Sequence, residues 1–251
     1  MRWEQEERSL AGHSKWSQIK RKKAVNDRQR GKIISKHIRA IQSAVREGGG
    51  DDPSSNLPLK NALSAAKTDD VPQDNIDRAI ERALGGTEGG DYEPVQYEGY
   101  GPGGIAVLVE ALTDNRNRTA SEVRHVFAKH GGNMSGSTAW QFETKGVVVL
   151  DGADEALQEL AIDLGAEDLE IDGGTLTVYT SPTDLYQVVD GLQQAGHTPE
   201  VSQLGKFAQT ETDLARSDAE KVVRFLEALE DLDDVQDVYS TANLDSVELV
   251  G

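Results

Sequence analysis

The residues best suited to chemistry in this 251-residue chain are lysines and arginines near its start. Between Gly12 and Arg46 there are eleven basic residues and a single acid, Asp27. Cationic groups at this density favour contact with phosphates, and Trp16 beside Lys15 offers a ring that can stack on a base. The segment therefore predicts nucleic-acid binding. The candidate residues are Lys15, Trp16, Lys20, Arg21, Lys22, Lys23, Arg28, Arg30, Lys32, Lys36 and Arg39.

Two plainer interpretations of this segment stay open. A charge run is often only a solvated surface, and Trp16 fits the core of a helical domain as well as it fits a nucleobase. The charge of the whole chain favours nucleic-acid binding over a merely solvated surface. Residues 1–46 have a net charge of +9 and residues 47–251 one of −27, so the total of −18 combines two opposite surfaces. This asymmetry is expected when one end of a protein meets a polyanion and the remainder resists non-specific binding.

A second group of cations lies in the loop before a predicted helix. Arg116 and Arg118 precede a sequence typical of a capping box, Thr119–Glu122, whose backbone amides favour anions. The loop is therefore a candidate for a subsidiary anion site. The alternative is that Asp114 and Asn115 form an ordinary turn and the two arginines pair with nearby acids.

Patterns that would indicate catalysis or a bound metal are weak. The chain has no cysteine, and its five histidines include no pair four residues apart. Gly99–Gly104 matches the glycine spacing of a dinucleotide-binding loop. However, a strand is predicted after it, where that motif needs a helix, and Pro102 lacks a backbone amide that could bind phosphate. Asp231–Asp234 lacks the glycine of a calcium loop, which favours a solvated helix end. We expect no metal, no cofactor and no enzymatic activity.

Hydrophobic periodicity predicts that part of the basic segment is helical and that further helices follow it. Apolar residues at helical spacing predict a helix over Gly31–Glu47, ended by three glycines, and further helices around Leu59–Ala66 and from Pro72 to Gly85. Lys32, Lys36 and Arg39 occupy the polar face of the first helix. These helices form one small domain, and the glycine-rich residues 85–91 form a joint after it.

Beyond the joint the pattern changes to strands and helices. A unit of strand, helix and strand occurs twice, within 146–171 and 175–204, which is typical of a split βαβ sandwich. The segments around it complete a second mixed domain, so the repeated unit is an insertion. They are strands at 95–97 and 105–111, a helix from the first capping box to Gly131, a helix opened by a second capping box at Ser217–Glu220, and a strand at 235–239.

The predicted fold class is therefore α+β with three domains: an N-terminal helical domain and two α/β domains, the third ferredoxin-like and inserted in the second. The expected boundaries are 1–10 for a disordered extension, 11–86 for the basic helical domain, 91–135 with 208–249 for the α/β domain, and 137–207 for the inserted domain. The longest purely apolar run has five residues, and Met1–Ser9 lacks the apolar stretch of a signal peptide. We expect a cytoplasmic protein.

Six segments together resemble the YebC family, and the resemblance covers most of residues 11–245. They are Ala11–Lys23, Gly31–Lys36, Thr113–Thr119, Gly131–Asn133, Ala139–Phe142 and Leu229–Val235. The resemblance implies the same three-domain fold, and it places the basic residues from Lys15 to Arg39 in the nucleic-acid-facing arm of the family. Such proteins commonly begin Met-Ala-Gly-His, whereas Leu10 stands before Ala11 here, so Met1–Ser9 is expected to be an extension without a structural role.

The resemblance also implies a class of function. Members are usually described as transcriptional regulators that bind DNA, and the family has no established enzymatic activity. A mitochondrial relative activates translation, and bacterial relatives resemble ribosome-associated factors that relieve stalling at proline runs. The expected partners are DNA, or ribosomal or transfer RNA on the ribosome, with a protein partner for the acidic domains. A protein-interaction module whose basic arm docks on acidic protein is the remaining alternative.

Overall fold

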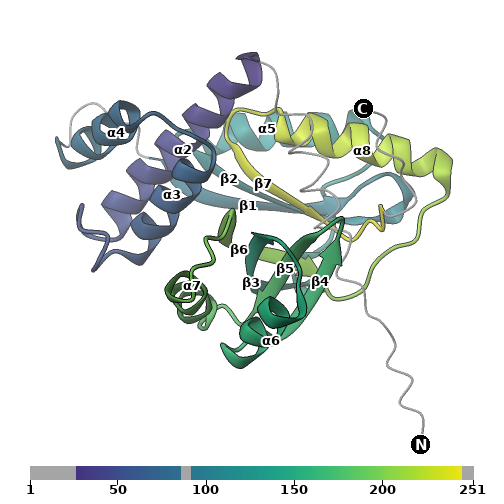
Figure 1. Cartoon of the computed structure of the whole chain (residues 1–251). Helices are drawn as coiled ribbons and strands as arrows, with labels where there is room; N and C mark the ends of the chain where they lie inside the picture. Colours follow the sequence, from purple (N-terminus) through teal and green to yellow (C-terminus); the bar gives the residue numbers. More distant parts are fainter. Residues whose placement is uncertain (1–26, 86–91, 245–251) are drawn as a thin grey trace, which may run out of the picture. The chain divides into compact units, whose positions relative to one another are not determined.

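The structure, a computed structural model, describes residues 27–85 and 92–244 (Figure 1). These residues form two compact units, one containing 27–30, 94–143 and 207–244, the other 31–85, 92–93 and 144–206. Separate hydrophobic cores lie in the helical region, in the mixed domain and in the inserted domain. The predicted α+β fold, with a third domain inserted in the second, is confirmed. The expected domain boundaries stay predictions, and the proposed extension at 1–10 lies outside the described residues.

The helical region consists of α2 (Asp27–Glu47), α3 (Leu57–Thr68) and α4 (Gln73–Gly85). The three predicted helices are present, and α2 begins four residues before the expected start and contains Gly31 within its first turns. All three helices contribute to one core. Its fully or nearly buried members are Ile41, Ala44, Val45, Leu59, Ala66, Val71, Ile76, Ala79 and Ala83.

The end of α2 is fixed by the buried side chain of Asn56, the N-cap of α3. Its amide group donates hydrogen bonds to the carbonyls of Ala44 and Gly50, both at 2.8 Å, while its oxygen accepts from the Leu59 amide at 3.0 Å. A Cβ on Gly48 would lie 2.1 Å from this oxygen. Only glycine therefore fits where the first of the three predicted helix-stopping glycines stands.

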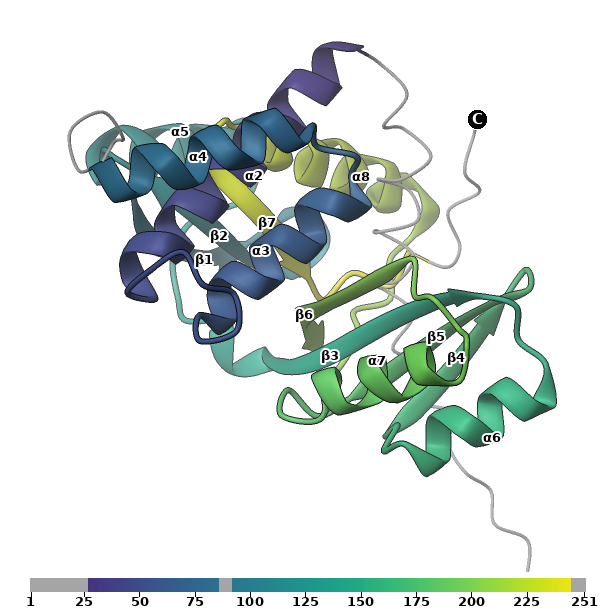
Figure 2. The ribbon, with the colours of Figure 1, turned by 60° about the vertical axis from the view of Figure 1, so that its left-hand side comes forward.

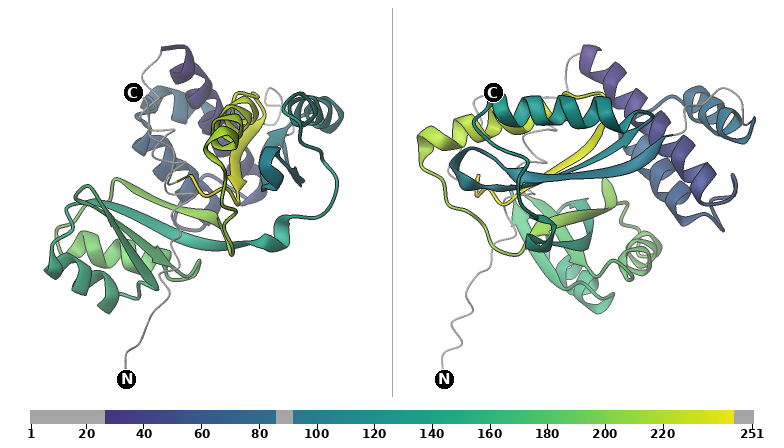
Figure 3. Two further views of the ribbon diagram at one scale, coloured as in Figure 1. Left: turned by 90° about the vertical axis from the view of Figure 1, so that its right-hand side faces the viewer. Right: turned by 180° about the vertical axis from the view of Figure 1, so that it is seen from behind.

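The mixed domain is a three-stranded sheet in the order β1 (Glu93–Tyr100), β2 (Ala106–Thr113) and β7 (Val235–Ser240). As its continuous apolar run predicts, β2 is the central strand, and it pairs antiparallel with β7. Two helices, α5 (Arg116–Lys129) and α8 (Arg216–Glu230), cover one face of this sheet (Figure 3).

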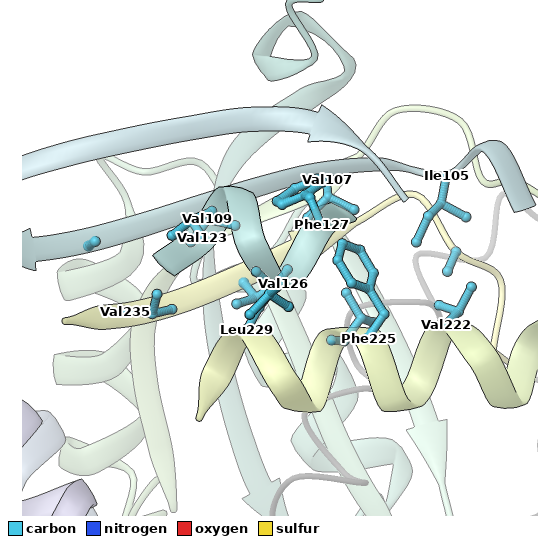
Figure 4. Close-up of a cluster of buried hydrophobic side chains, with 14 of the residues drawn as sticks. Ile105, Val107, Val109, Val123, Val126, Phe127, Val222, Phe225, Leu229 and Val235 are labelled. Carbon is cyan, nitrogen blue, oxygen red and sulfur yellow. The ribbon is translucent and has the colours of Figure 1, made fainter. Parts of the chain in front are cut away.

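The main core of the mixed domain lies between this sheet and its two helices (Figure 4). Phe127 of α5 meets Phe225 of α8 edge to face, with ring centroids 5.0 Å apart. Alternate residues of β2, such as Val107 and Val109, point into this core. A smaller cluster forms from the residues between them, with Leu108 packed among side chains that include Phe142.

The glycine-rich segment Gly99–Gly104 is a turn between two strands, as its sequence context predicts. A 3-10 helix, η1 (Pro102–Gly104), joins β1 directly to β2, so no helix N-terminus follows the glycines. A Cβ on Gly99 would lie 2.4 Å from the carbonyl oxygen of Asn133. This glycine therefore permits a close approach of two backbone segments.

The inserted domain has the predicted repeated order of strand, helix and strand (Figure 2). Its sheet has the order β4-β5-β3-β6, and β5 pairs antiparallel with both β3 and β4, as in a ferredoxin-like fold. Residues of both helices form one hydrophobic core with alternate residues of β3 and β5. The elements are β3 (Phe142–Asp151), α6 (Glu155–Asp163), β4 (Asp168–Asp172), β5 (Thr175–Thr180), α7 (Leu185–Gln194) and β6 (Val201–Ala208).

The predicted capping box at Ser217–Glu220 is wrong. Helix α8 begins at Arg216, after Ala215, and no side chain caps it. Its first turn is closed by backbone hydrogen bonds instead, including one from the Asp218 amide to the Ala215 carbonyl at 2.8 Å.

Candidate nucleic-acid interface

The basic residues of α2 lie on the side of the helix opposite its apolar stripe. Lys32, Lys36 and Arg39 are four and three residues apart, a spacing that places them on one side of a helix. All three are half-buried, and each takes part in an interaction within the structure. The Arg39 guanidinium lies 5.8 Å from the ring centroid of Tyr92, while Arg30, near the start of the helix, is exposed. The side chains of these three cations are therefore less exposed than a solvated polar face would leave them.

The other candidates in the basic segment stay predictions. Arg28 belongs to α2, but its side chain lies outside the part of the molecule that the structure describes. Six candidates precede the described residues altogether: Lys15, Trp16, Lys20, Arg21, Lys22 and Lys23.

The loop with two arginines is built differently from the sequence prediction. Helix α5 begins at Arg116, and its N-cap is Asn115, whose side chain accepts a hydrogen bond from the Arg118 amide at 3.1 Å. The predicted capping box at Thr119–Glu122 is therefore wrong. Thr119 is buried inside the first turns of the helix, where its hydroxyl lies 3.2 Å from the Asn115 carbonyl.

Asp234, which directly precedes β7, connects this helix start to the rest of the domain. Its carboxylate accepts hydrogen bonds from the hydroxyls of Thr119 at 2.7 Å and Thr113 at 3.2 Å. The Arg118 guanidinium reaches the same oxygen at 2.5 Å and also contacts Asp114 at 2.9 Å. The predicted solvated helix end is thus wrong for Asp234, whose side chain is only 5% exposed.

The interactions of this cluster stabilise the ionised forms of both Asp234 and Arg118. Burial opposes the ionisation of Asp234, but the hydrogen bonds from Arg118, Thr119 and Thr113 outweigh it, so the pKa of this carboxyl is lowered. The hydrogen bond that Arg118 donates to Asp234 in turn raises the pKa of Arg118. Arg118 is therefore paired with acids, as the alternative interpretation expected. Anion binding by Arg116 and Arg118 stays a prediction.

A second anchored loop, before β3, was not anticipated. The Glu98 carboxylate of β1 accepts hydrogen bonds from the backbone amides of Thr138 at 2.5 Å and Ala139 at 2.7 Å, and from the Ser137 hydroxyl at 3.0 Å. The Ala139 amide is the main cause of a lowered pKa of Glu98, against the opposing effect of burial. The loop presents Trp140, which is 69% exposed and donates its indole N–H to the Ser137 carbonyl at 3.0 Å.

Replacing Glu98 with alanine is expected to destabilise the protein by about 2 kcal/mol, because two loop amides and a hydroxyl lose their acceptor. Urea denaturation followed by circular dichroism measures the change. The matched control is Asp237→Ala, which removes an exposed carboxylate from β7 in the same sheet and is expected to cost less than about 0.5 kcal/mol. Equal effects of the two substitutions would show that the loop does not depend on Glu98.

The described residues contain no group of three or more His, Asp or Glu side chains placed to hold a metal ion. Within the same ranges, no helix has the length and apolar composition that crossing a membrane requires.

Comparison with known proteins places this arrangement in a family. Residues 14–86 match the TACO1/YebC protein N-terminal domain, and residues 92–242 match the TACO1/YebC second and third domain. The chain belongs to the TACO1/YebC family. The YebC resemblance of the sequence segments is thereby confirmed.

Two bacterial TACO1/YebC relatives and one solved structure match the chain over nearly its whole length. A Thermus thermophilus protein is 56% identical, covering 96% of this chain and 99% of its own, and one from Deinococcus radiodurans is 54% identical, covering 94% and 98%. Both are named "Probable transcriptional regulatory protein". The crystal structure of a conserved hypothetical protein from Aquifex aeolicus is 45% identical with a TM-score of 0.82, covering 91% of this chain and 96% of its own.

The residues that sequence reasoning missed are Asp234, Glu98 and Trp140. Asp234 and Trp140 fall within segments that carry the family resemblance, but nothing in the local sequence distinguishes Asp234 from Asp231 or Asp233. Its hydroxyl partners lie 115 and 121 positions away, so only the tertiary fold reveals its role.

Proposed function

We propose that this TACO1/YebC protein is a non-enzymatic regulator of gene expression that binds nucleic acid through its basic N-terminal segment. The observation that carries the proposal is the division of charge. Eleven cations and one acid between Gly12 and Arg46 precede a body with a net charge of −27 over residues 47–251. The names of the relatives support a regulatory role. The segment is expected to supply phosphate contacts, and the acidic domains to position it or to meet a protein partner.

The exposed chemistry of α2 favours contact with phosphates over reading of bases. A sequence-specific duplex reader presents side chains such as Asn, Gln and Arg to base edges. The one amide on the helix face considered for such contacts, Gln42, is 4% exposed. Weak sequence preference is therefore expected, which suits a ribosome-associated translation factor that relieves stalling at proline runs at least as well as a transcriptional regulator.

Competition for labelled protein between a promoter fragment, scrambled DNA of equal length and ribosomes tests this proposal. Similar Kd values are expected for the two DNAs, whereas a specific reader discriminates by about a thousandfold or more. Strong discrimination between the DNAs without ribosome association would establish the transcriptional function and exclude the translational one.

The second alternative, a protein-interaction module, differs in its response to nuclease. Copurification of partners that survives nuclease treatment, together with no binding to any of the three competitors, would favour that module over the proposed function. Loss of the partners after nuclease treatment is the expected result.

A further inference from the structure

The exposed face of α5 is a second cationic surface within an acidic domain. Residues 116–145 contain five Lys or Arg and two Asp or Glu, whereas the rest of residues 47–251 contains eight and 38. Arg116, Arg118, Arg124 and Lys129 of α5 are all exposed, as is His125. The buried stripe of the helix lies on its other side and packs into the domain core.

Several cations on other described helices are paired with an acid of their own helix. On α8, Lys221 is paired with Asp218 at 2.8 Å and Arg224 with Glu220 at 3.2 Å. On α4, Arg78 lies 3.9 Å from Asp74. These pairs are three or four residues apart along one helix, so each cation is partly neutralised by its own helix.

Arg124 and Lys129 have no such neighbour. Within the described ranges, neither makes an ion pair with an Asp or Glu side chain, and the one acid of α5, Glu122, is half-buried. Lys129 lies in the last turn, where a cation stabilises the helix dipole. That explanation does not apply to Arg124 in the middle of the helix. The face therefore retains positive charge that the fold does not neutralise.

We propose that this exposed face of α5, with Arg124 and Lys129 toward its two edges, binds the phosphate backbone of a nucleic-acid duplex. The inference rests on the proposed function and adds a contact surface to it. A 14-residue helix is about 20 Å long, which matches the rise of about six phosphates along one strand. The exposed positions of α5 hold no Phe, Tyr or Trp side chain for stacking, and their charged side chains are cationic, so phosphates are the chemistry that fits.

The structure also decides which residues should be tested. Arg118 is held by Asp234 and Asp114, so its substitution would disturb the fold as well as the surface charge. Arg124 and Lys129 are exposed and make no ion pair within the described ranges, so replacing them leaves the buried contacts of α5 intact.

The test uses the full chain carrying Arg124→Glu and Lys129→Glu, with Lys221→Glu and Arg224→Glu on α8 as the control of equal charge. Anisotropy with 30-base-pair DNA and RNA duplexes of one sequence gives Kd between 50 and 200 mM salt. The α5 variant is expected to bind the preferred duplex about 10- to 100-fold more weakly at 100 mM salt, with a salt slope smaller by about two. The α8 control is expected to keep the wild-type slope.

The outcomes separate this inference from the proposed function. Equal losses in the α5 variant and the α8 control, or no loss in either, would overturn the inference while leaving the function intact. A wild-type chain that binds neither duplex at 50 mM salt would overturn the inference, and one that also fails to bind ribosomes would overturn the proposed function as well. Circular dichroism and thermal unfolding establish that the variants are folded. If the glutamate pair is not, Arg124→Gln with Lys129→Gln is expected to reduce the slope by the same two contacts.

Discussion

Nucleic-acid affinity is expected to fall about a thousandfold when the salt concentration rises from 50 to 200 mM. The reason is that neutralising roughly six or more phosphates releases their bound counterions, and added salt opposes this release. The basic segment between Gly12 and Arg46 holds eleven cations, which is enough for that number of contacts. Titration of a labelled duplex at four salt concentrations gives the slope directly. A flat response would contradict phosphate contact as the source of affinity.

The same measurement locates the contacts on the chain. Replacing Arg21, Lys22 and Lys23 with glutamine is expected to reduce the salt slope by about three, since each residue is a proposed phosphate contact. The matched control replaces the same number of exposed cations elsewhere in the helical region, on α3 and α4, with glutamine. These are Lys67, Arg78 and Arg82. A slope that changes equally in both variants would show that overall charge, and not the basic segment, controls binding.

Much of the fold follows from local sequence because its signals are periodic or steric. Ile34, Ile38 and Ile41 recur at helical spacing, and they mark the face of α2 that packs against α3 and α4. Strand β5 begins at Thr175, the residue at which the second predicted unit of strand, helix and strand begins. Glycine at position 48 ends α2 as expected, since any larger residue would meet Asn56. These features depend on a few neighbouring residues, so a single sequence is enough to find them.

The contacts of the candidate site are harder to predict from the sequence, because the partners of its side chains are distant along the chain. Thr119 has the local sequence of a helix cap, yet Asn115 caps the helix and the Thr119 hydroxyl bonds to Asp234. Glu98 is an ordinary strand residue until the fold brings Thr138 and Ala139 to its carboxylate. A local sequence pattern contains no information about a hydrogen-bond acceptor that lies 40 or 115 positions away. The sequence therefore indicated that the arginine loop is cationic, but not which residues its side chains contact.

Replacing Asp234 with alanine is expected to destabilise the protein by about 3 kcal/mol. The substitution removes the shared acceptor of Thr113, Thr119 and Arg118, so two buried hydroxyls lose a partner and the start of α5 loses its tie to β7. Losses of this size are typical when one member of a buried hydrogen-bonded charge cluster is removed. Urea denaturation measures the change. The nearby Asp237→Ala, which alters an exposed side chain, is expected to stay within about 0.5 kcal/mol of the wild type.

The pH dependence of stability distinguishes the charge of Asp234 from its shape. Because its pKa is lowered in the folded protein, Asp234 contributes stability above the ordinary carboxyl pKa of about 4, and that contribution is lost as pH falls through the folded-state pKa. Asp234→Asn keeps the shape but has no charge to lose. The variant is therefore expected to be less stable than the wild type at pH 7, and the difference is expected to shrink steadily as pH falls below about 4. A difference that stays constant between pH 7 and pH 3 would mean that Asp234 acts through packing alone.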